Sequence, residues 1–135
     1  MTKPEIEYLS NAPLEVHDIA RVFDSSGISR PTSDLARIER MFAAPSLVIS
    51  AWASGKLIGV CRSLTDYAYC CYLSDLAVAS EFQGQGIGGE LIRRTKALIG
   101  SEVSLILLSA PSAMTYYPNQ GFEKAENAFV IRRQI

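Results

Sequence analysis

A glycine-rich turn between an apolar strand and an amphipathic helix constrains the fold more than any other part of the chain. The turn reads Gln83-Gly84-Gln85-Gly86-Ile87-Gly88-Gly89 and follows the apolar run from Leu73 to Val78. Glycines at such a turn let the main chain approach an anion closely, and the N–H groups at the start of a helix attract negative charge. The turn therefore predicts a phosphate-binding site built on one strand and one helix.

The size and charge of the chain favour one folded unit. It has 135 residues, 48% of them hydrophobic, and a formal net charge of -1, which suits a single domain over residues 1–135. The balanced charge gives no field that would attract nucleic acid. No apolar run approaches the roughly 20 residues that cross a bilayer, and residues 1–5 lack the apolar core of a signal peptide. We therefore expect a cytoplasmic protein that binds neither nucleic acid nor membranes.

The scarcity of histidine and cysteine excludes several kinds of chemistry. His17 is the only histidine, and no cysteine or carboxylate stands beside it at the spacing of metal ligands. We expect no metal site and no hydrolase that depends on a catalytic histidine. Cys61, Cys70 and Cys71 form neither an even disulfide framework nor a zinc-like spacing, so we expect strand residues in a reducing compartment.

The order of the predicted elements indicates an α+β fold with a mixed, mostly antiparallel sheet, flanking helices and one central βαβ unit. A strand over 6–9 precedes two helices. The first is capped at Asn11 and ends near residue 23, and the second covers 35–42, with Pro45 marking its end. Strands over 47–52, 57–61 and 69–78 are joined too closely for crossover helices and form an antiparallel meander. The βαβ unit is completed by a helix over 87–99 and a buried strand over 103–108. A short helix over 110–117 and one or two closing strands over 122–133 follow.

The glycine turn fits two phosphate-binding spacings. Gly84-x-Gly86-x-x-Gly89 is the dinucleotide spacing, whereas Gln83-x-x-Gly86-x-Gly88 is associated with acyl-coenzyme A. A dinucleotide fold normally begins with its glycine turn and carries an acidic residue at the end of the next strand, where this chain has Ser109. The late position of the turn and the missing acid both disfavour a dinucleotide.

Two motifs in the same order make the chain similar to the GNAT superfamily of acyl-coenzyme A-dependent N-acetyltransferases. In the first, an apolar triplet after Asp75 leads to Gln83-x-x-Gly86-x-Gly88; the second is Tyr116-Tyr117-Pro118-Asn119-Gln120-Gly121-Phe122. The resemblance covers nearly the whole chain and implies a GNAT-like acyl-CoA N-acyltransferase fold. One departure is Ala110, which stands where many relatives have an asparagine that contacts the cofactor.

The resemblance implies that acetyl-CoA is the acetyl donor and that main-chain groups hold it. The apolar triplet would pair with the pantetheine amides like an added strand, and an N–H near Leu76 would face the thioester oxygen. The glycine turn and the start of the helix would bind the pyrophosphate. The cofactor-binding residues so implied are Leu76, Ala77, Val78, Gln83, Gly84, Gln85, Gly86, Ile87, Gly88 and Gly89.

Two side chains are candidates for catalysis. An alkylammonium has a pKa of about 10.4, so attack on a thioester at neutral pH needs a proton acceptor. Asp75, a carboxylate in an otherwise apolar strand, is the candidate base, with Asp66 in reserve; a purely structural strand-end acid is the other interpretation of Asp75. Tyr117 aligns with the tyrosine that protonates the departing thiolate in many relatives, while Tyr116 is expected to pack.

The function predicted from these motifs is acetyl transfer to a primary amine of a small molecule or a peptide, by direct attack on the thioester. A non-catalytic acyl-CoA-binding sensor or regulatory module is the alternative, and a nicotinamide-dependent oxidoreductase comes third. The absence of a strong acidic cluster counts against polyamines and aminoglycosides as acceptors. The apolar segment Ala128-Phe129-Val130-Ile131 and the open sheet edges are compatible with a homodimer as well as with a monomer.

Overall fold

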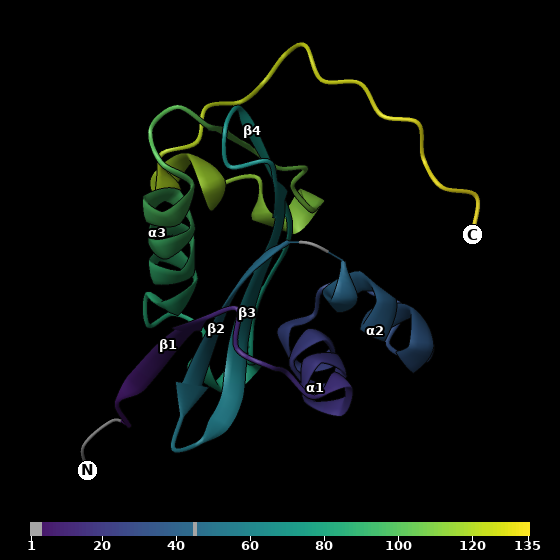
Figure 1. The fold of residues 1–135 in the computed structure, drawn as a ribbon, viewed down its shortest axis with the longest axis vertical. Helices are drawn as coiled ribbons and strands as arrows, with labels where there is room; N and C mark the ends of the chain where they lie inside the picture. The colour runs from purple at the N-terminus through teal and green to yellow at the C-terminus, as the bar shows by residue number, and fades with distance from the viewer. Residues whose placement is uncertain (1–3, 45) are drawn as a thin grey trace.

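A five-stranded sheet with helices on both faces forms the body of the protein (Figure 1). The structure is a computed structural model and describes residues 4–44 and 46–135. Within these ranges, the 3₁₀ turn η1 (Ser80–Phe82) lies between the fourth strand and the third helix, and the 3₁₀ turns η2 (Pro111–Ala113) and η3 (Tyr117–Gln120) follow the last strand. In chain order the other elements are β1 (Ile6–Ser10), α1 (Val16–Ser26), α2 (Leu35–Ala43), β2 (Leu47–Ala53), β3 (Lys56–Thr65), β4 (Cys70–Val78), α3 (Ile87–Ile99) and β5 (Ser104–Ile106).

The strands follow one another in the order β1-β2-β3-β4-β5. The pairs from β1 to β4 are antiparallel, and β5 lies parallel to β4. Short turns make the meander possible: Ser54 and Gly55, at φ of 51° and 77°, form the tight hairpin between β2 and β3. A mixed, mostly antiparallel sheet with a βαβ unit of β4, α3 and β5 is thus confirmed.

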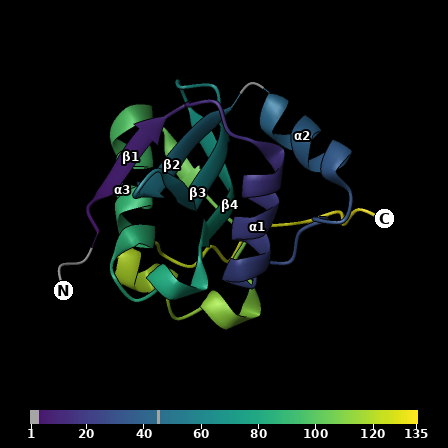
Figure 2. The same ribbon diagram turned by 90° about the horizontal axis from the view of Figure 1, so that it is seen from below.

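The two faces of the sheet bury separate sets of apolar side chains, because successive strand residues point to opposite faces. Ile49 and Cys61 face α3, where they meet Leu91 and Ile92. Val48 and Val60 belong to the other face, with Ile19 and Phe23 of α1. Figure 2 shows α3 and α1 on opposite sides of the strands. Helices therefore cover both faces of the sheet, and the main-chain groups without a hydrogen-bonding strand beside them lie along the edges and at the ends of the sheet.

β4 and β5 run side by side for only three residues. Cys70, Cys71 and Tyr72 pair with Ser104, Leu105 and Ile106, and the ladder then stops. On the other side, β4 stays paired with β3 as far as Val78, across an irregularity at Ser74. From Leu73 onward β4 thus has a ladder partner on one side only within the described part of the chain. The sheet is split at this point, beside the strand that leads to the glycine turn.

The closing strands expected over 122–133 are wrong: no strand is present between residues 122 and 135. Phe129 and Ile131 are 95% and 102% exposed, and the segment runs away from the sheet toward the side of α2 (Figure 1). A short apolar run such as Ala128-Phe129-Val130-Ile131 indicates a strand but does not specify its partner, and no ladder partner is present among the described residues. The homodimer stays a prediction.

Two helix predictions also need correction. The first helix is capped by Glu15, whose side chain accepts from His17 N–H, and not by Asn11. Asn11 instead accepts a hydrogen bond from the N–H of Val48 and joins β1 to β2. The expected helix over 110–117 is replaced by η2 and η3, because Pro111 and Pro118 favour short turns. The predicted end marker of the second helix, Pro45, lies outside the described residues; α2 ends at Ala43.

Candidate functional site

A groove of about 1910 Å³ opens where β4 and β5 separate. One part of its wall comes from β4, the glycine turn and the start of α3, and another from residues 107–113 and η3. The loop between α1 and α2, the adjoining face of α2 and the C-terminal residues complete it. The groove-lining residues used below are Arg30, Arg37, Arg62, Leu76, Val78, Gln83, Gly84, Gly86, Ile87, Gly88, Gly89, Tyr116, Tyr117, Arg132 and Arg133.

The glycine turn presents main-chain N–H groups to the groove. Gly84 and Gly86 have φ of 78° and 83°, a region that favours glycine, and no atom lies within 4 Å of the position a Cβ would take at either residue. Gly86 caps α3 without a side-chain hydrogen bond, so the first N–H groups of the helix have no intrahelical partner. These features make the turn an open anion-binding site at the positive end of a helix.

Gly88 and Gly89 serve a different purpose from Gly84 and Gly86. A Cβ at Gly88 would come within 2.6 Å of the Tyr116 hydroxyl, and one at Gly89 within 2.8 Å of Gln120 Oε1. Both residues lie in the first turn of α3, so their small size lets η3 pack against the helix. Tyr116 and Tyr117 are thereby held beside the phosphate-binding turn.

The predicted cofactor-binding residues gather around the groove with two exceptions. Leu76 and Val78 line it from the half of β4 that has no β5 partner. Ala77 packs its side chain against the α1 face of the sheet, and Gln85 is not part of the lining. Any contribution of these two residues to ligand binding would come from their main-chain groups. Gln83 fixes the turn, because its Nε2 donates to the Val78 carbonyl at 2.9 Å.

Tyr117 lies in the groove wall at the start of η3. Its ring packs edge-on against Tyr116, at 5.2 Å between centroids, and against Phe122, at 5.5 Å. Burial, with a smaller effect of the neighbouring Tyr116, raises the pKa of Tyr117 above its usual value. The phenol therefore keeps its proton at neutral pH, as a proton donor must. Tyr116 also lines the groove, and burial raises its pKa as well.

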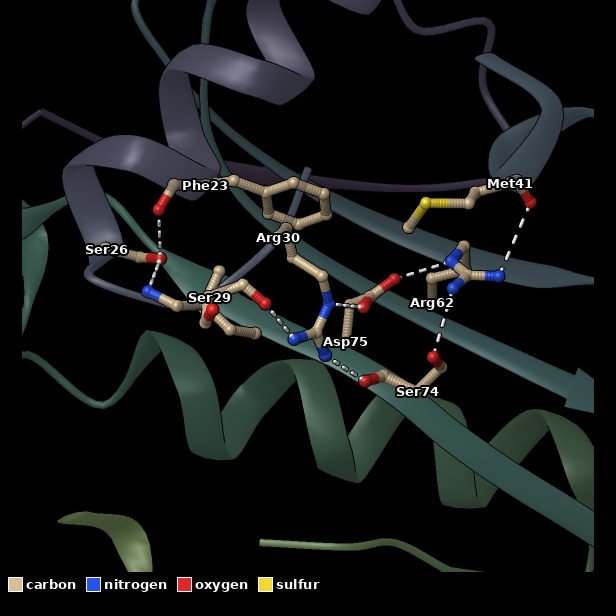
Figure 3. A network of polar contacts seen from close by, with 9 residues as sticks. Phe23, Ser26, Ser29, Arg30, Met41, Arg62, Ser74 and Asp75 are labelled. Atoms are coloured by element: carbon tan, nitrogen blue, oxygen red, sulfur yellow. Dashed lines mark hydrogen bonds and ion pairs between the residues drawn. The ribbon is translucent and has the colours of Figure 1, made fainter. Parts of the chain in front are cut away.

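Asp75 lies in a buried ion triad (Figure 3). Its carboxylate is fully buried; Oδ1 accepts from Arg30 Nε and Oδ2 from Arg62 Nε, both at 2.5 Å. Both guanidinium groups also bind Ser74: Arg30 donates to the carbonyl oxygen of Ser74, and Arg62 donates to the hydroxyl of Ser74. With both oxygens bonded to cations, Asp75 has the environment of a structural carboxylate, which disfavours its predicted role as the base.

Asp66, the reserve base, is exposed and caps the turn between β3 and β4. Its Oδ1 accepts main-chain N–H bonds from Ala68, Tyr69 and Cys70, and the bond from Ala68 contributes most to lowering its pKa. It is not among the groove-lining residues. Its geometry therefore explains the shape of the turn and gives no support to a catalytic role.

Arg30 and Arg62 are the site residues that the sequence analysis missed. The sequence carries a signal for Arg62, because this residue directly follows the apolar run 57–61 and pairs with Asp75 in the β3–β4 ladder. A charged residue of each sign in neighbouring buried strands signals an ion pair. Arg30 comes from the α1–α2 loop, 45 residues away in sequence, and no local pattern indicates its contact.

The cysteines are free, and none of the described residues forms a cluster that could hold a metal ion. All three are strand residues, as expected; Cys61 and Cys71 are buried, and Cys70 is exposed at the start of β4. Burial raises the pKa of Cys61 to about 12, which keeps that thiol neutral and unreactive. No helix in the described ranges is long and apolar enough to cross a membrane.

Comparisons with known proteins agree with this geometry. The probable acetyltransferase TAP2 of Glycine max is 30% identical over 132 residues, 90% of this chain and 53% of the relative; the histone acetyltransferase TAP1 of the same species is 30% identical over 133 residues, 90% and 58%. The chain thus spans little more than half the length of these relatives. The crystal structure of the aminoglycoside N-acetyltransferase AAC(6')-Iy in complex with CoA has the same fold, with a TM-score of 0.71, 16% identity and coverage of 99% of this chain and 98% of that one. The model of the acetyltransferase (GNAT) domain matches residues 19–132, and the chain therefore belongs to the GNAT acetyltransferase family.

Proposed function

We propose that this protein transfers the acetyl group of acetyl-CoA to a primary amine. The observation that carries the proposal is the half of β4 that has no partner on the β5 side within the described chain; it runs along the groove directly into the glycine turn. A linear ligand with amides at one end and phosphates at the other fits this order of main-chain groups. Membership of the GNAT family supports the same donor.

Each part of the donor has a matching part of the groove. Main-chain groups of β4 between Leu76 and Val78 would pair with the pantetheine amides as a neighbouring strand does. The N–H groups from Gly84 to Gly88 would bind the pyrophosphate, aided by the positive end of α3. The thioester would then lie near the irregularity at Ser74, where the acceptor can approach from the α1–α2 side.

The transfer is a direct displacement at the thioester. The neutral amine nitrogen attacks the carbonyl carbon, the C–N bond forms, and the C–S bond breaks to release the thiolate of CoA. Tyr117 donates its phenolic proton to that thiolate and regains a proton from solvent. The proton of the attacking amine passes to water, since the groove lining contains no aspartate or glutamate.

The groove itself assists by favouring the neutral form of the amine. Five arginines line it without an acidic residue among the lining positions, and nearby positive charge lowers the pKa of an ammonium group. Each pKa unit by which the groove lowers that value reduces the cost of deprotonation by about 1.4 kcal/mol. This effect replaces part of what a carboxylate base would supply.

A non-catalytic sensor of acyl-CoA is the second candidate. The observation in its favour is the same lack of a carboxylate in the groove lining, since the two predicted bases are engaged elsewhere. A sensor would bind the cofactor and leave its thioester intact.

Calorimetry with acetyl-CoA followed by a thiol-release assay over a panel of primary amines tests the proposal. We expect binding of acetyl-CoA, no binding of NAD, and release of free CoA that depends on one class of amine. Binding without amine-dependent release on any member of the panel would favour the sensor. Binding of NAD in place of acetyl-CoA would refute both.

A further inference from the structure

The acceptor side of the groove carries a strong excess of positive charge. The lining includes Arg30, Arg37 and Arg62, with Arg132 and Arg133 from the C-terminal segment, and it includes no aspartate or glutamate. Among the described side chains, the carboxylate in contact with this group is Asp75, which lies behind Arg30 and Arg62; Arg37 also donates to the main-chain oxygen of Ile135 at 3.4 Å. One negative charge therefore faces five positive ones among the side chains that the structure describes.

The buried part of this group is itself unbalanced. The side chains of Arg30, Arg62 and Asp75 are 21%, 8% and 0% exposed, and together they carry a net charge of +1. An uncompensated charge at a buried site is costly, so a further anion there would be strongly favoured.

The arginine side chains also keep hydrogen-bonding capacity. A guanidinium has five N–H groups; Arg30 donates three hydrogen bonds in the structure and Arg62 donates three. The planar groups are held in place by Asp75 and Ser74, and Arg62 also lies over the ring of Phe42 at 5.4 Å. Fixed guanidinium groups with unused N–H donors are suited to bind a carboxylate or a phosphate through bidentate hydrogen bonds.

The position of the arginines separates them from the predicted phosphate site. Arg30 and Arg62 bind Ser74 and Asp75, whereas the glycine turn begins beyond Val78. Four residues of extended strand span about 13 Å, so phosphates held at the turn would lie beyond hydrogen-bonding range of the arginines at Ser74.

We propose that the acceptor is a primary amine that also carries an anionic group, a carboxylate or a phosphate, and that the arginines of the α1–α2 side bind this group. The inference rests on the proposed function and specifies its acceptor. Polyamines, aminoglycosides and lysine-rich peptides would be repelled by the same charges. Two-point binding by guanidinium would also orient the amine toward the thioester.

Matched pairs of amines that differ only in the anionic group test the proposal. Tyrosine against tyramine probes a carboxylate, and O-phosphoethanolamine against ethanolamine probes a phosphate. We expect kcat/KM to be at least tenfold higher for the anionic member of one pair, and the pair with the larger ratio identifies the group. Equal values within both pairs, or a preference for tyramine and ethanolamine, would overturn the inference.

The variant Arg37→Gln, with Arg40→Gln as its control, tests whether the groove arginines bind the anionic group of the acceptor. Both arginines belong to α2, but Arg37 is partly buried and lines the groove, whereas Arg40 is exposed outside it. We expect Arg37→Gln to raise KM for the anionic amine at least fivefold, with KM for acetyl-CoA unchanged, and Arg40→Gln to change neither. A rise in KM for acetyl-CoA alone would place Arg37 in the acetyl-CoA site and refute this part of the inference.

A binding measurement separates failure of the inference from failure of the proposed function. Calorimetry with the CoA-saturated protein compares N-acetyltyrosine with N-acetyltyramine, and N-acetyl-phosphoethanolamine with N-acetylethanolamine. Tighter binding of an anionic member without turnover of any amine would refute acetyl transfer and uphold the anionic site. Equal binding within both pairs would refute the site whether or not the protein turns over amines.

Discussion

Replacing Asp75 by asparagine distinguishes a structural carboxylate from a catalytic base. The substitution keeps the shape of the side chain but removes the only negative charge of a triad whose members are 0%, 8% and 21% exposed. The amide can accept a hydrogen bond from one guanidinium, while its NH₂ group faces the other donor. Two buried positive charges would then lie side by side without a counter-ion.

The expected loss of stability is large. Removing one partner of a buried ion pair typically costs about 3–5 kcal/mol, which is a substantial part of the roughly 5–15 kcal/mol that holds a domain folded. With a denaturant dependence of about 1.5 kcal/mol/M in urea, the unfolding midpoint should fall by roughly 2–3 M. Asp18→Asn is the control, because the Asp18–Arg21 pair is exposed and should contribute less than about 1 kcal/mol.

Urea denaturation and the pH–rate profile, measured on the same Asp75→Asn protein, decide between the two roles. The structure predicts a lower unfolding midpoint, and a pH dependence of kcat/KM whose shape is unchanged in the molecules that stay folded. An unchanged unfolding midpoint together with a collapse of kcat and loss of the acidic limb of the profile would refute the structural role and restore Asp75 as the base.

Three further predictions concern the phosphate turn, the tyrosine and pH. Gly86→Ala should raise the Kd for acetyl-CoA more than tenfold, because its Cβ would enter the open space of the groove that the phosphates are proposed to occupy. Gly55→Ala, at a similar φ in a remote hairpin, should lower stability without affecting the calorimetric Kd. Equal effects of both variants on Kd would contradict the turn as the phosphate site. Tyr117→Phe should lower kcat at least tenfold with little change in Kd for acetyl-CoA, and Tyr116→Phe should retain most activity; the reverse result in the thiol-release assay would exchange their roles. Hydrogen bonds from Arg93, and then Arg94, lower the pKa of Glu90 to about 2, so its folded-state pKa is below the unfolded value near 4.5. Its stabilising contribution is therefore present above pH 4.5 and lost as pH falls toward 2, and the difference in unfolding midpoint between the wild type and Glu90→Gln should disappear over that range.

The parts of the fold that depend on local pattern could be predicted from the sequence. Apolar periodicity and short turns placed the meander, α3 and the parallel position of β5, and the glycines placed the phosphate turn. The predicted strand over 103–108 is shorter in the structure, where β5 covers Ser104–Ile106. Its length depends on how far β4 stays alongside it, which is a property of the tertiary structure.

The missed features depend on contacts between distant segments. Phe129 and Ile131 have the pattern of a strand, yet the chain described here offers them no ladder partner. Asp75 stands out in the sequence as a carboxylate in an apolar strand, but its two partners come from β3 and from the α1–α2 loop. A carboxylate in an apolar strand has the same sequence signature whether it is a base or the centre of an ion triad, and only the positions of the two arginines separate these cases.

The proposed binding of the cofactor at the split between β4 and β5 would link ligand binding to the integrity of the sheet. Main-chain groups from Leu73 to Val78 that face the split have no ladder partner in the described chain, and such an edge can pair with any extended chain that reaches it. A ligand that occupies this edge completes the sheet and stabilises the folded state by about 2.7 kcal/mol at a concentration 100 times its Kd. The cofactor would thus also protect the protein from edge-to-edge aggregation, so its cellular level would influence how much folded protein persists.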